Sequence, residues 1–149
     1  MVIRKKEVYD GATPSGNAVM AHSLFYLSII FDNSAWREHA ESMLQSLGQA
    51  IGRYPTSFGV WALFLQSLVK NINEIAITGK NAHSILKDVM KEFIPNKIVQ
   101  ASPNENEKFP LLKNKKSRKG ETLIYLCSNY SCREPVKSVS ELMSLLETK

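Results

Sequence analysis

The chain of 149 residues is 44% hydrophobic, which is enough to bury one core and favours one domain with at most a small appendage. No apolar run is long enough to cross a membrane, the basic N-terminus leads into Glu7 and Asp10 instead of an apolar signal region, and two cysteines cannot form a disulfide framework. We therefore expect no membrane association and a cytoplasmic location, while the formal net charge of +5 raises the question of nucleic-acid binding.

The N-terminal part of the chain predicts a helical hairpin. Residues 10–17 contain the turn sequences Asp-Gly and Pro-Ser-Gly, and Ser15 is suited to cap a helix that extends to about Phe31. After a short polar break, a second helix with one apolar stripe is expected to extend from Ser34 to about Ile51. Because the connection is short, the two helices should pack in antiparallel fashion.

A third helix, over about 57–70, is apolar on nearly all sides. A free-standing two-layer domain could not cover all of this surface, so neighbours on both faces are expected. The sequence therefore predicts that residues 1–71 form a segment of helical hairpins and that this third helix mediates a homo-oligomer.

Residues 72–149 predict a small α/β unit, because the periodicity of the apolar residues changes. A β-type run at 74–78 is followed by an amphipathic helix at 82–93 and a second strand-like run at 97–101. Strand, helix and strand at these lengths form a βαβ unit, so the two strands should be parallel.

The helix of this unit is expected to bury Met90 and Phe93 together with its other apolar side chains. A third strand is expected at 122–127, and Ser138 and Glu141 form a capping box that opens a last helix. The predicted fold class is therefore α+β, with N-terminal helical hairpins followed by a small α/β unit.

The positive charge is concentrated at residues 113–119, inside a loop at 101–121 that has no periodicity. A solvated loop is the favoured interpretation, and nucleic-acid binding is not expected because no aromatic residues alternate with the lysines. A small basic interaction module that binds nucleic acid or an acidic partner through residues 113–119 stays as an alternative.

Cys127 and Cys132 are separated by four residues, a spacing unsuited to zinc, and no other cysteine or nearby histidine completes a metal site. Two partly buried thiols that fix a turn are favoured over a disulfide, since structural disulfides are uncommon in the cytosol. A thiol-redox element that uses both cysteines is an alternative function. Gly79-Lys80-Asn81 is interpreted as a connecting turn instead of a phosphate site, and no cofactor is expected.

A pocket for a sugar or another hydroxyl-bearing ligand is expected where the polar residues meet the start of the first helix. The candidate ligand-binding residues are Asp10, Ser15, Asn17 and His22. A hydrogen-bonded core role for His22 is favoured over that of a catalytic base. Asp10 alone does not supply the two carboxylates of a glycosidase, so the isolated chain is not expected to be an enzyme.

Four stretches in order resemble a widespread family of thioredoxin-domain-containing proteins of the sperm-associated type. They are residues 10–17, Arg53-Tyr54-Pro55, residues 74–79 with 93–97, and residues 125–136, which are the most specific because they resemble the family's C-x-N-[FY]-[TS]-C-x-x-P-V signature. In that family a thioredoxin-like domain precedes a helical toroid of the six-hairpin glycosidase type. The C-x-x-C motif and most of the toroid hairpins are missing from this chain.

The resemblance implies that the chain is the C-terminal fragment of such a protein, without catalysis of its own. It would comprise a segment of the α/α toroid and an appended α/β unit. In the full-length protein, the resemblance implies a carbohydrate-type ligand in the toroid cavity. Asp10, Ser15, Asn17 and His22 are the positions expected to face that ligand.

Overall fold

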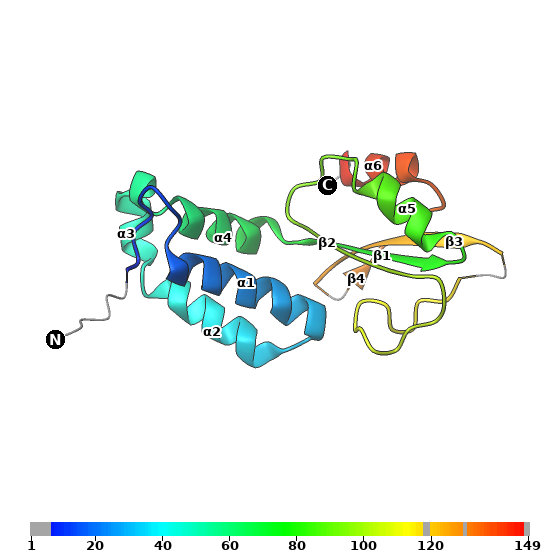
Figure 1. The fold of residues 1–149 in the computed structure, drawn as a ribbon, viewed down its shortest axis with the longest axis horizontal. Coiled ribbons are helices and arrows are strands. Elements are labelled where there is room, and N and C mark those ends of the chain that lie inside the picture. The colour runs from blue at the N-terminus through cyan, green and yellow to red at the C-terminus, as the bar shows by residue number, and fades with distance from the viewer. Residues whose placement is uncertain (1–6, 118–119, 130, 148–149) are drawn as a thin grey trace. The chain divides into compact units, whose positions relative to one another are not determined.

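A computed structural model describes residues 7–117, 120–129 and 131–147 (Figure 1). The fold is α+β, with N-terminal helices and a four-stranded mixed sheet, which confirms the predicted class. The chain divides into two compact units, Met1–Lys70 and Asn71–Lys149. None of the helices in the described ranges combines the length and apolar character needed to cross a bilayer.

The first unit is helical. Ser15 caps its first helix as predicted, since the Ser15 hydroxyl accepts the amide of Ala18 at 3.4 Å. Asp32 ends this helix in the left-handed conformation (φ 51°), and the Asn33 side chain caps the next helix by accepting the Trp36 amide at 3.1 Å. The elements are α1 (Gly16–Phe31), α2 (Ser34–Gln45), α3 (Gly48–Arg53), the 3₁₀ turn η1 (Pro55–Ser57) and α4 (Gly59–Lys70).

The prediction of one helix from Ser34 to about Ile51 is wrong, because the chain forms two helices, α2 and α3, over this range. Leu47 leaves the helical conformation (φ −115°, ψ 2°), and the Ser46 hydroxyl donates to the backbone oxygen of Met43 at 2.7 Å. Serine and glycine have low helix propensity, so Ser46 and Gly48 favour the end of the helix at this point.

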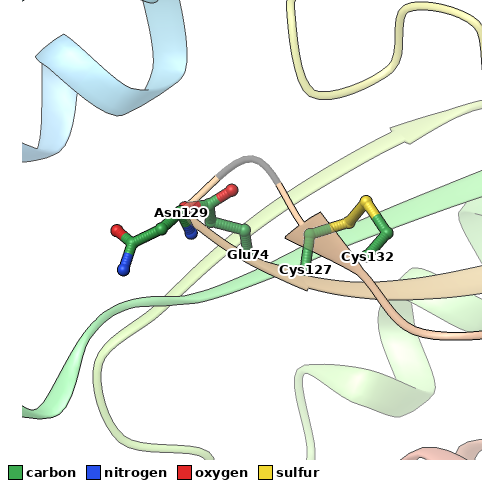
Figure 2. Close-up of a disulfide and its surroundings, with 4 residues drawn as sticks. All are labelled: Glu74, Cys127, Asn129 and Cys132. Atoms are coloured by element: carbon green, nitrogen blue, oxygen red, sulfur yellow. A yellow bond between two sulfur atoms is a disulfide. The ribbon is translucent and has the colours of Figure 1, made fainter.

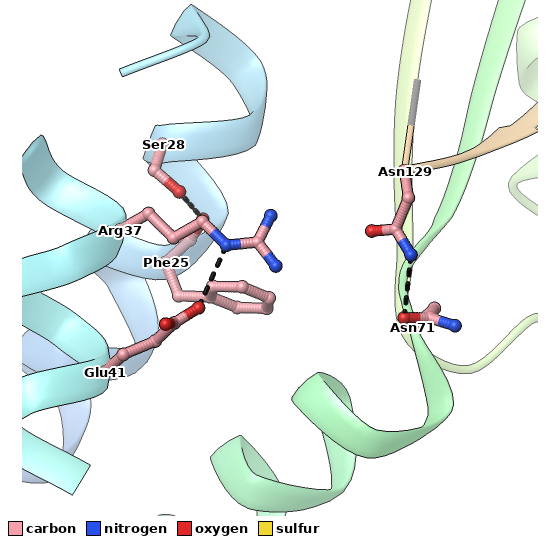
Figure 3. A network of polar contacts seen from close by, with 6 residues as sticks. All are labelled: Phe25, Ser28, Arg37, Glu41, Asn71 and Asn129. Carbon is pink, nitrogen blue, oxygen red and sulfur yellow. Dashed lines mark hydrogen bonds and ion pairs between the residues drawn. The ribbon is translucent and has the colours of Figure 1, made fainter. Parts of the chain in front are cut away.

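The core of the first unit lies between α1 and α4. Trp61 and Phe64 are buried on α4, and the Phe25 ring of α1 lies 5.3 Å from the Phe64 ring. Ala18 and Ala21 of α1 are also fully buried. At the other edge of α1, Arg37 of α2 forms an ion pair with Glu41 at 2.9 Å (Figure 3).

The second unit is built on a sheet of order β2-β1-β3-β4. β1 and β2 are parallel, which confirms the predicted βαβ unit, and β1 pairs with β3 in antiparallel fashion. The two-residue strand β4 was not predicted. The elements are β1 (Asn73–Gly79), α5 (Ala82–Val89), β2 (Lys97–Ser102), β3 (Thr122–Ser128), β4 (Ser131–Cys132) and α6 (Val139–Glu147).

The helices α5 and α6 cover one face of this sheet (Figure 1). Ile75 and Ile77 of β1 point into this core, where they meet Val89 of α5 and Leu142 of α6. Alternation along the strand places Glu74, Ala76 and Thr78 on the opposite face. In Figure 1 the connection between β2 and β3 lies on that side of the sheet.

The expectation that Met90 and Phe93 are buried is wrong, since they are 57% and 88% exposed. The helix α5 ends at Val89, and Ile94 takes the buried position instead. Pro95 disfavours the helical conformation at the residue before it, and the chain must turn to enter the parallel strand β2. The periodicity of the segment therefore extends past the helix itself.

The capping box at the start of α6 is present. The Ser138 hydroxyl accepts the Glu141 amide at 3.3 Å, and the Glu141 carboxylate accepts the backbone N–H of Lys137 at 2.8 Å. This carboxylate reaches one residue further back than in the usual box.

Candidate functional site

The carboxylate of Asp10 joins the starts of two helices. One oxygen accepts the backbone N–H of Ser15 and the other accepts that of Val60, each at 2.8 Å. The Asp10 amide also donates to the backbone oxygen of Ser57 at 2.9 Å. Both carboxylate oxygens thus satisfy amides that would otherwise lack partners at the beginnings of α1 and α4.

Ser15 and Asn17 hold the segment that precedes α1. The Ser15 hydroxyl and the Asn17 amide nitrogen donate to the backbone oxygen of Glu7 at 3.0 and 2.7 Å. The Trp61 indole N–H donates to the backbone oxygen of Val8 at 2.9 Å. A pocket of about 430 Å³ lies here, lined by Glu7, Tyr9, Gly11, Ala12, Thr13, Pro14, Ser15 and Gly16. The structure therefore brings Asp10, Ser15 and Asn17 together and engages each of them in the fold.

His22 lies in a different polar cluster, between α1 and α4. Its Nε2 is 3.3 Å from the Ser67 hydroxyl, which donates to the backbone oxygen of Leu63 at 3.0 Å. The imidazole stacks on the Phe64 ring at 5.6 Å and meets the edge of the Tyr26 ring at 5.0 Å. The tautomer of the imidazole decides whether Nε2 donates to the Ser67 hydroxyl or accepts from it.

Burial sets the protonation of this cluster. It lowers the pKa of His22 below 6.5, which favours the neutral imidazole at neutral pH. It also raises the pKa of Tyr26 above 10, although a hydrogen bond with Ser67 acts in the opposite direction. The phenol therefore keeps its proton and can act as a donor.

A second pocket, of about 300 Å³, opens beside this cluster. It is lined by Val19, His22, Ser23, Tyr26 and Val60. This lining can offer both stacking surface and hydrogen bonds to a small polar ligand. The stacking surface comes from the Tyr26 ring and the His22 imidazole, and the hydrogen bonds come from the imidazole and the hydroxyls of Ser23 and Tyr26.

Sequence reasoning missed Ser23, Tyr26 and Ser67. Tyr26 follows His22 by four residues, so helical spacing could have placed both on one face. Ser67 carried no such signal, because its contact with His22 joins residues 45 apart in sequence. The four predicted ligand residues are thus divided, with His22 lining a pocket that Asp10, Ser15 and Asn17 do not line.

In the second unit, Cys127 and Cys132 form a disulfide (Figure 2), so the favoured interpretation of two free thiols is wrong. The two residues lie directly opposite each other in the β3–β4 pair. This register was invisible in the sequence because β4 has only two residues. A cavity of about 200 Å³ is lined by Leu126, Cys127, Ser128, Ser131, Cys132 and Arg133.

The basic loop is anchored to the sheet and is not simply solvated as expected. Leu111 and Leu112 are buried, and the Tyr125 hydroxyl donates to the backbone oxygen of Lys116 at 3.0 Å. The Lys115 ammonium lies 5.8 Å from the centre of the Tyr125 ring. Burial lowers the pKa of Lys115, and the Glu74 carboxylate partly offsets this effect. Residues 118 and 119 of the predicted interaction segment lie outside the described residues.

The turn at Gly79-Lys80-Asn81 has an internal function. The Asn81 backbone N–H, at the start of α5, donates to the Thr122 hydroxyl at 3.0 Å.

In the described part of the chain, no three His, Cys, Asp or Glu side chains gather as a metal site would require.

The chain is similar to the spermatogenesis-associated protein 20 of Rattus norvegicus and of Homo sapiens. Each is 26% identical over 153 residues that cover 97% of this chain. An uncharacterized protein of Caenorhabditis elegans is 22% identical over 96% of the chain. The chain spans only about a fifth of the length of these relatives, with 19%, 20% and 20% covered.

No protein-family model matches the chain, and no solved structure matches it significantly. The similarity to these relatives extends over nearly the whole chain, as do the four stretches that carry the predicted resemblance.

Proposed function

We propose that this chain is part of a larger helical protein and has no catalytic activity by itself. In this proposal the first unit is a C-terminal segment of an α/α toroid, and the pocket around His22 and Tyr26 contributes to a site for a carbohydrate-type ligand. The coverage of only about a fifth of the relatives' length supports the first part. A cytoplasmic location stays a prediction.

The observation that carries the ligand proposal is the makeup of the pocket beside His22. Sugars present apolar C–H faces and hydroxyl groups, and they are bound by aromatic rings together with neutral hydrogen-bonding groups. Tyr26 can supply the ring, while His22 and Ser23 can supply donors and acceptors. None of the residues lining this pocket carries a carboxylate, so we propose binding and not glycoside hydrolysis.

Replacing Tyr26 with alanine should weaken sugar binding about tenfold, because a stacking surface of this kind contributes on the order of 1 kcal/mol. Amide NMR shifts of the ¹⁵N-labelled chain, titrated with a panel of neutral mono- and disaccharides, would measure even weak binding. Tyr54→Ala is the matched control, since Tyr54 is 55% exposed and does not line the pocket. The proposal is wrong if no sugar shifts the Val19 to Tyr26 amides, or if both variants bind equally well.

The isolated chain should self-associate through α4. Leu63, Leu65 and Val69 are 55%, 41% and 70% exposed, and Leu65 and Val69 are neighbours one turn apart. In a full toroid, further helical hairpins would bury these exposed apolar side chains of α4. In the isolated chain, a second copy of the chain can bury them instead.

Light scattering after size exclusion, over increasing protein concentration, should therefore detect a dimer that the double variant Leu65→Lys, Val69→Lys abolishes. Met90→Lys is the control, because Met90 is 57% exposed in the other unit. A strictly monomeric wild-type chain at high concentration would refute this prediction.

The alternative of a basic interaction module has less support. Lys115 is half-buried against Tyr125, and so it contributes less than expected to an exposed basic patch.

A further inference from the structure

The two cysteines of the disulfide between Cys127 and Cys132 differ in their exposure to solvent. Cys127 is 2% exposed, whereas Cys132 is exposed at the edge of the sheet. Both residues line the same cavity of about 200 Å³, together with Arg133. A small thiol can therefore approach the bond from the Cys132 side, and access is one of the factors that decide which sulfur is attacked.

The hairpin that carries the disulfide is also held by contacts that do not involve sulfur. The Asn129 backbone N–H donates to the Glu74 carboxylate at 3.3 Å, and the Asn129 side chain donates to that of Asn71 at 3.1 Å (Figure 3). Figure 2 shows Glu74 and Asn129 close to the two cysteines.

On the other side of the hairpin, the backbone N–H of Arg133 donates to Leu126 at 2.9 Å, and its guanidinium donates to the backbone oxygen of Leu145 at 2.8 Å. The disulfide closes a loop with a sequence separation of only 5. A disulfide across so short a loop removes less entropy from the unfolded chain than one across a long loop, so it stabilises the folded hairpin less. The hairpin should therefore persist when the bond is opened, with the two thiols still close enough to re-form it.

We propose that Cys127 and Cys132 form a reversible thiol–disulfide exchange site that accepts electrons from a dithiol. A thiolate of the dithiol attacks Sγ of Cys132 and forms a mixed disulfide. The electron pair of the broken bond passes to Sγ of Cys127, which takes up a proton. The second thiolate of the dithiol then attacks the dithiol sulfur of the mixed disulfide and releases Cys132, which is protonated. Two electrons and two protons have moved, and the dithiol has become a disulfide.

This site lies in the second unit and is independent of the sugar pocket in the first. Its test uses the whole oxidised chain under native conditions with dithiothreitol as the dithiol, followed by maleimide labelling and intact mass. We expect two labels per chain, a folded pattern of amide NMR signals retained in the strands and helices of the second unit, and restoration of the bond by oxidised glutathione. A bond that opens only in denaturant, or a unit that unfolds on reduction, would overturn the proposal.

A second experiment locates the attacked sulfur. Reduced glutathione, a monothiol, should be trapped as a mixed disulfide that tandem mass spectrometry places on Cys132. As a matched pair, the Cys127→Ser variant should react with maleimide about tenfold faster than the Cys132→Ser variant, because the thiol it retains is the exposed one. Glutathione attached to Cys127, or equal labelling rates in the two variants, would refute the assigned direction of attack.

Discussion

Replacing Gly79 with alanine should lower the free energy of unfolding of the α/β unit by at least about 3 kcal/mol. Gly79 has a φ of 124°, a conformation that residues with a side chain rarely adopt. A Cβ atom there would collide with the backbone oxygen of Glu121 and would lie 2.8 Å from Cα of Thr122. Thr122 belongs to the paired strand β3 and Glu121 directly precedes it, so these backbone atoms cannot move aside without breaking the sheet register.

Gly120→Ala is the matched control. Gly120 also has a positive φ, of 84°, but a Cβ atom there would meet nothing within 4 Å. Only the backbone cost remains, which is about 1–2 kcal/mol. Urea unfolding followed by circular dichroism and by amide exchange in the β1 strand would compare the two. Equal losses would mean that the close approach to β3 does not restrict residue 79.

Replacing Asp10 with alanine should lower the free energy of unfolding of the helical unit by about 2–3 kcal/mol. The amides of Ser15 and Val60 would both lose their acceptor, although partial exposure lets water compensate in part. Asp10→Asn keeps one acceptor oxygen and should lose about half as much. Urea unfolding followed by the fluorescence of the buried Trp61 measures this unit directly.

The same variant separates two roles for Asp10. If it braces the fold, stability falls in Asp10→Ala, whereas a residue used only for ligand binding would leave stability unchanged. Glu38→Ala is the control, because Glu38 is an exposed carboxylate on α2 in the same unit and its loss should change little. An Asp10→Ala chain as stable as the wild type would return Asp10 to the list of ligand candidates.

Local signals in the sequence predicted much of the fold. Ser15 and Ser138 were recognisable as helix caps, since a cap depends on residues within one turn. The parallel strands β1 and β2 followed from the order strand, helix, strand, because the crossover connection constrains their direction. Helix ends were less predictable, as Leu47 and Phe93 illustrate, because apolar periodicity continues past the point where the backbone turns.

The sequence by itself determined the α+β class and the residue types available for a site in each half. Only the tertiary structure decided how those residues are used. Asp10 holds two helix starts together by accepting the backbone N–H of Val60, 50 residues away, and His22 contacts Ser67, 45 residues away. Cys127 met Cys132 because a strand too short to recognise placed them opposite each other. Each outcome depends on how separate segments pack, and periodicity along one segment carries no information about its distant partner.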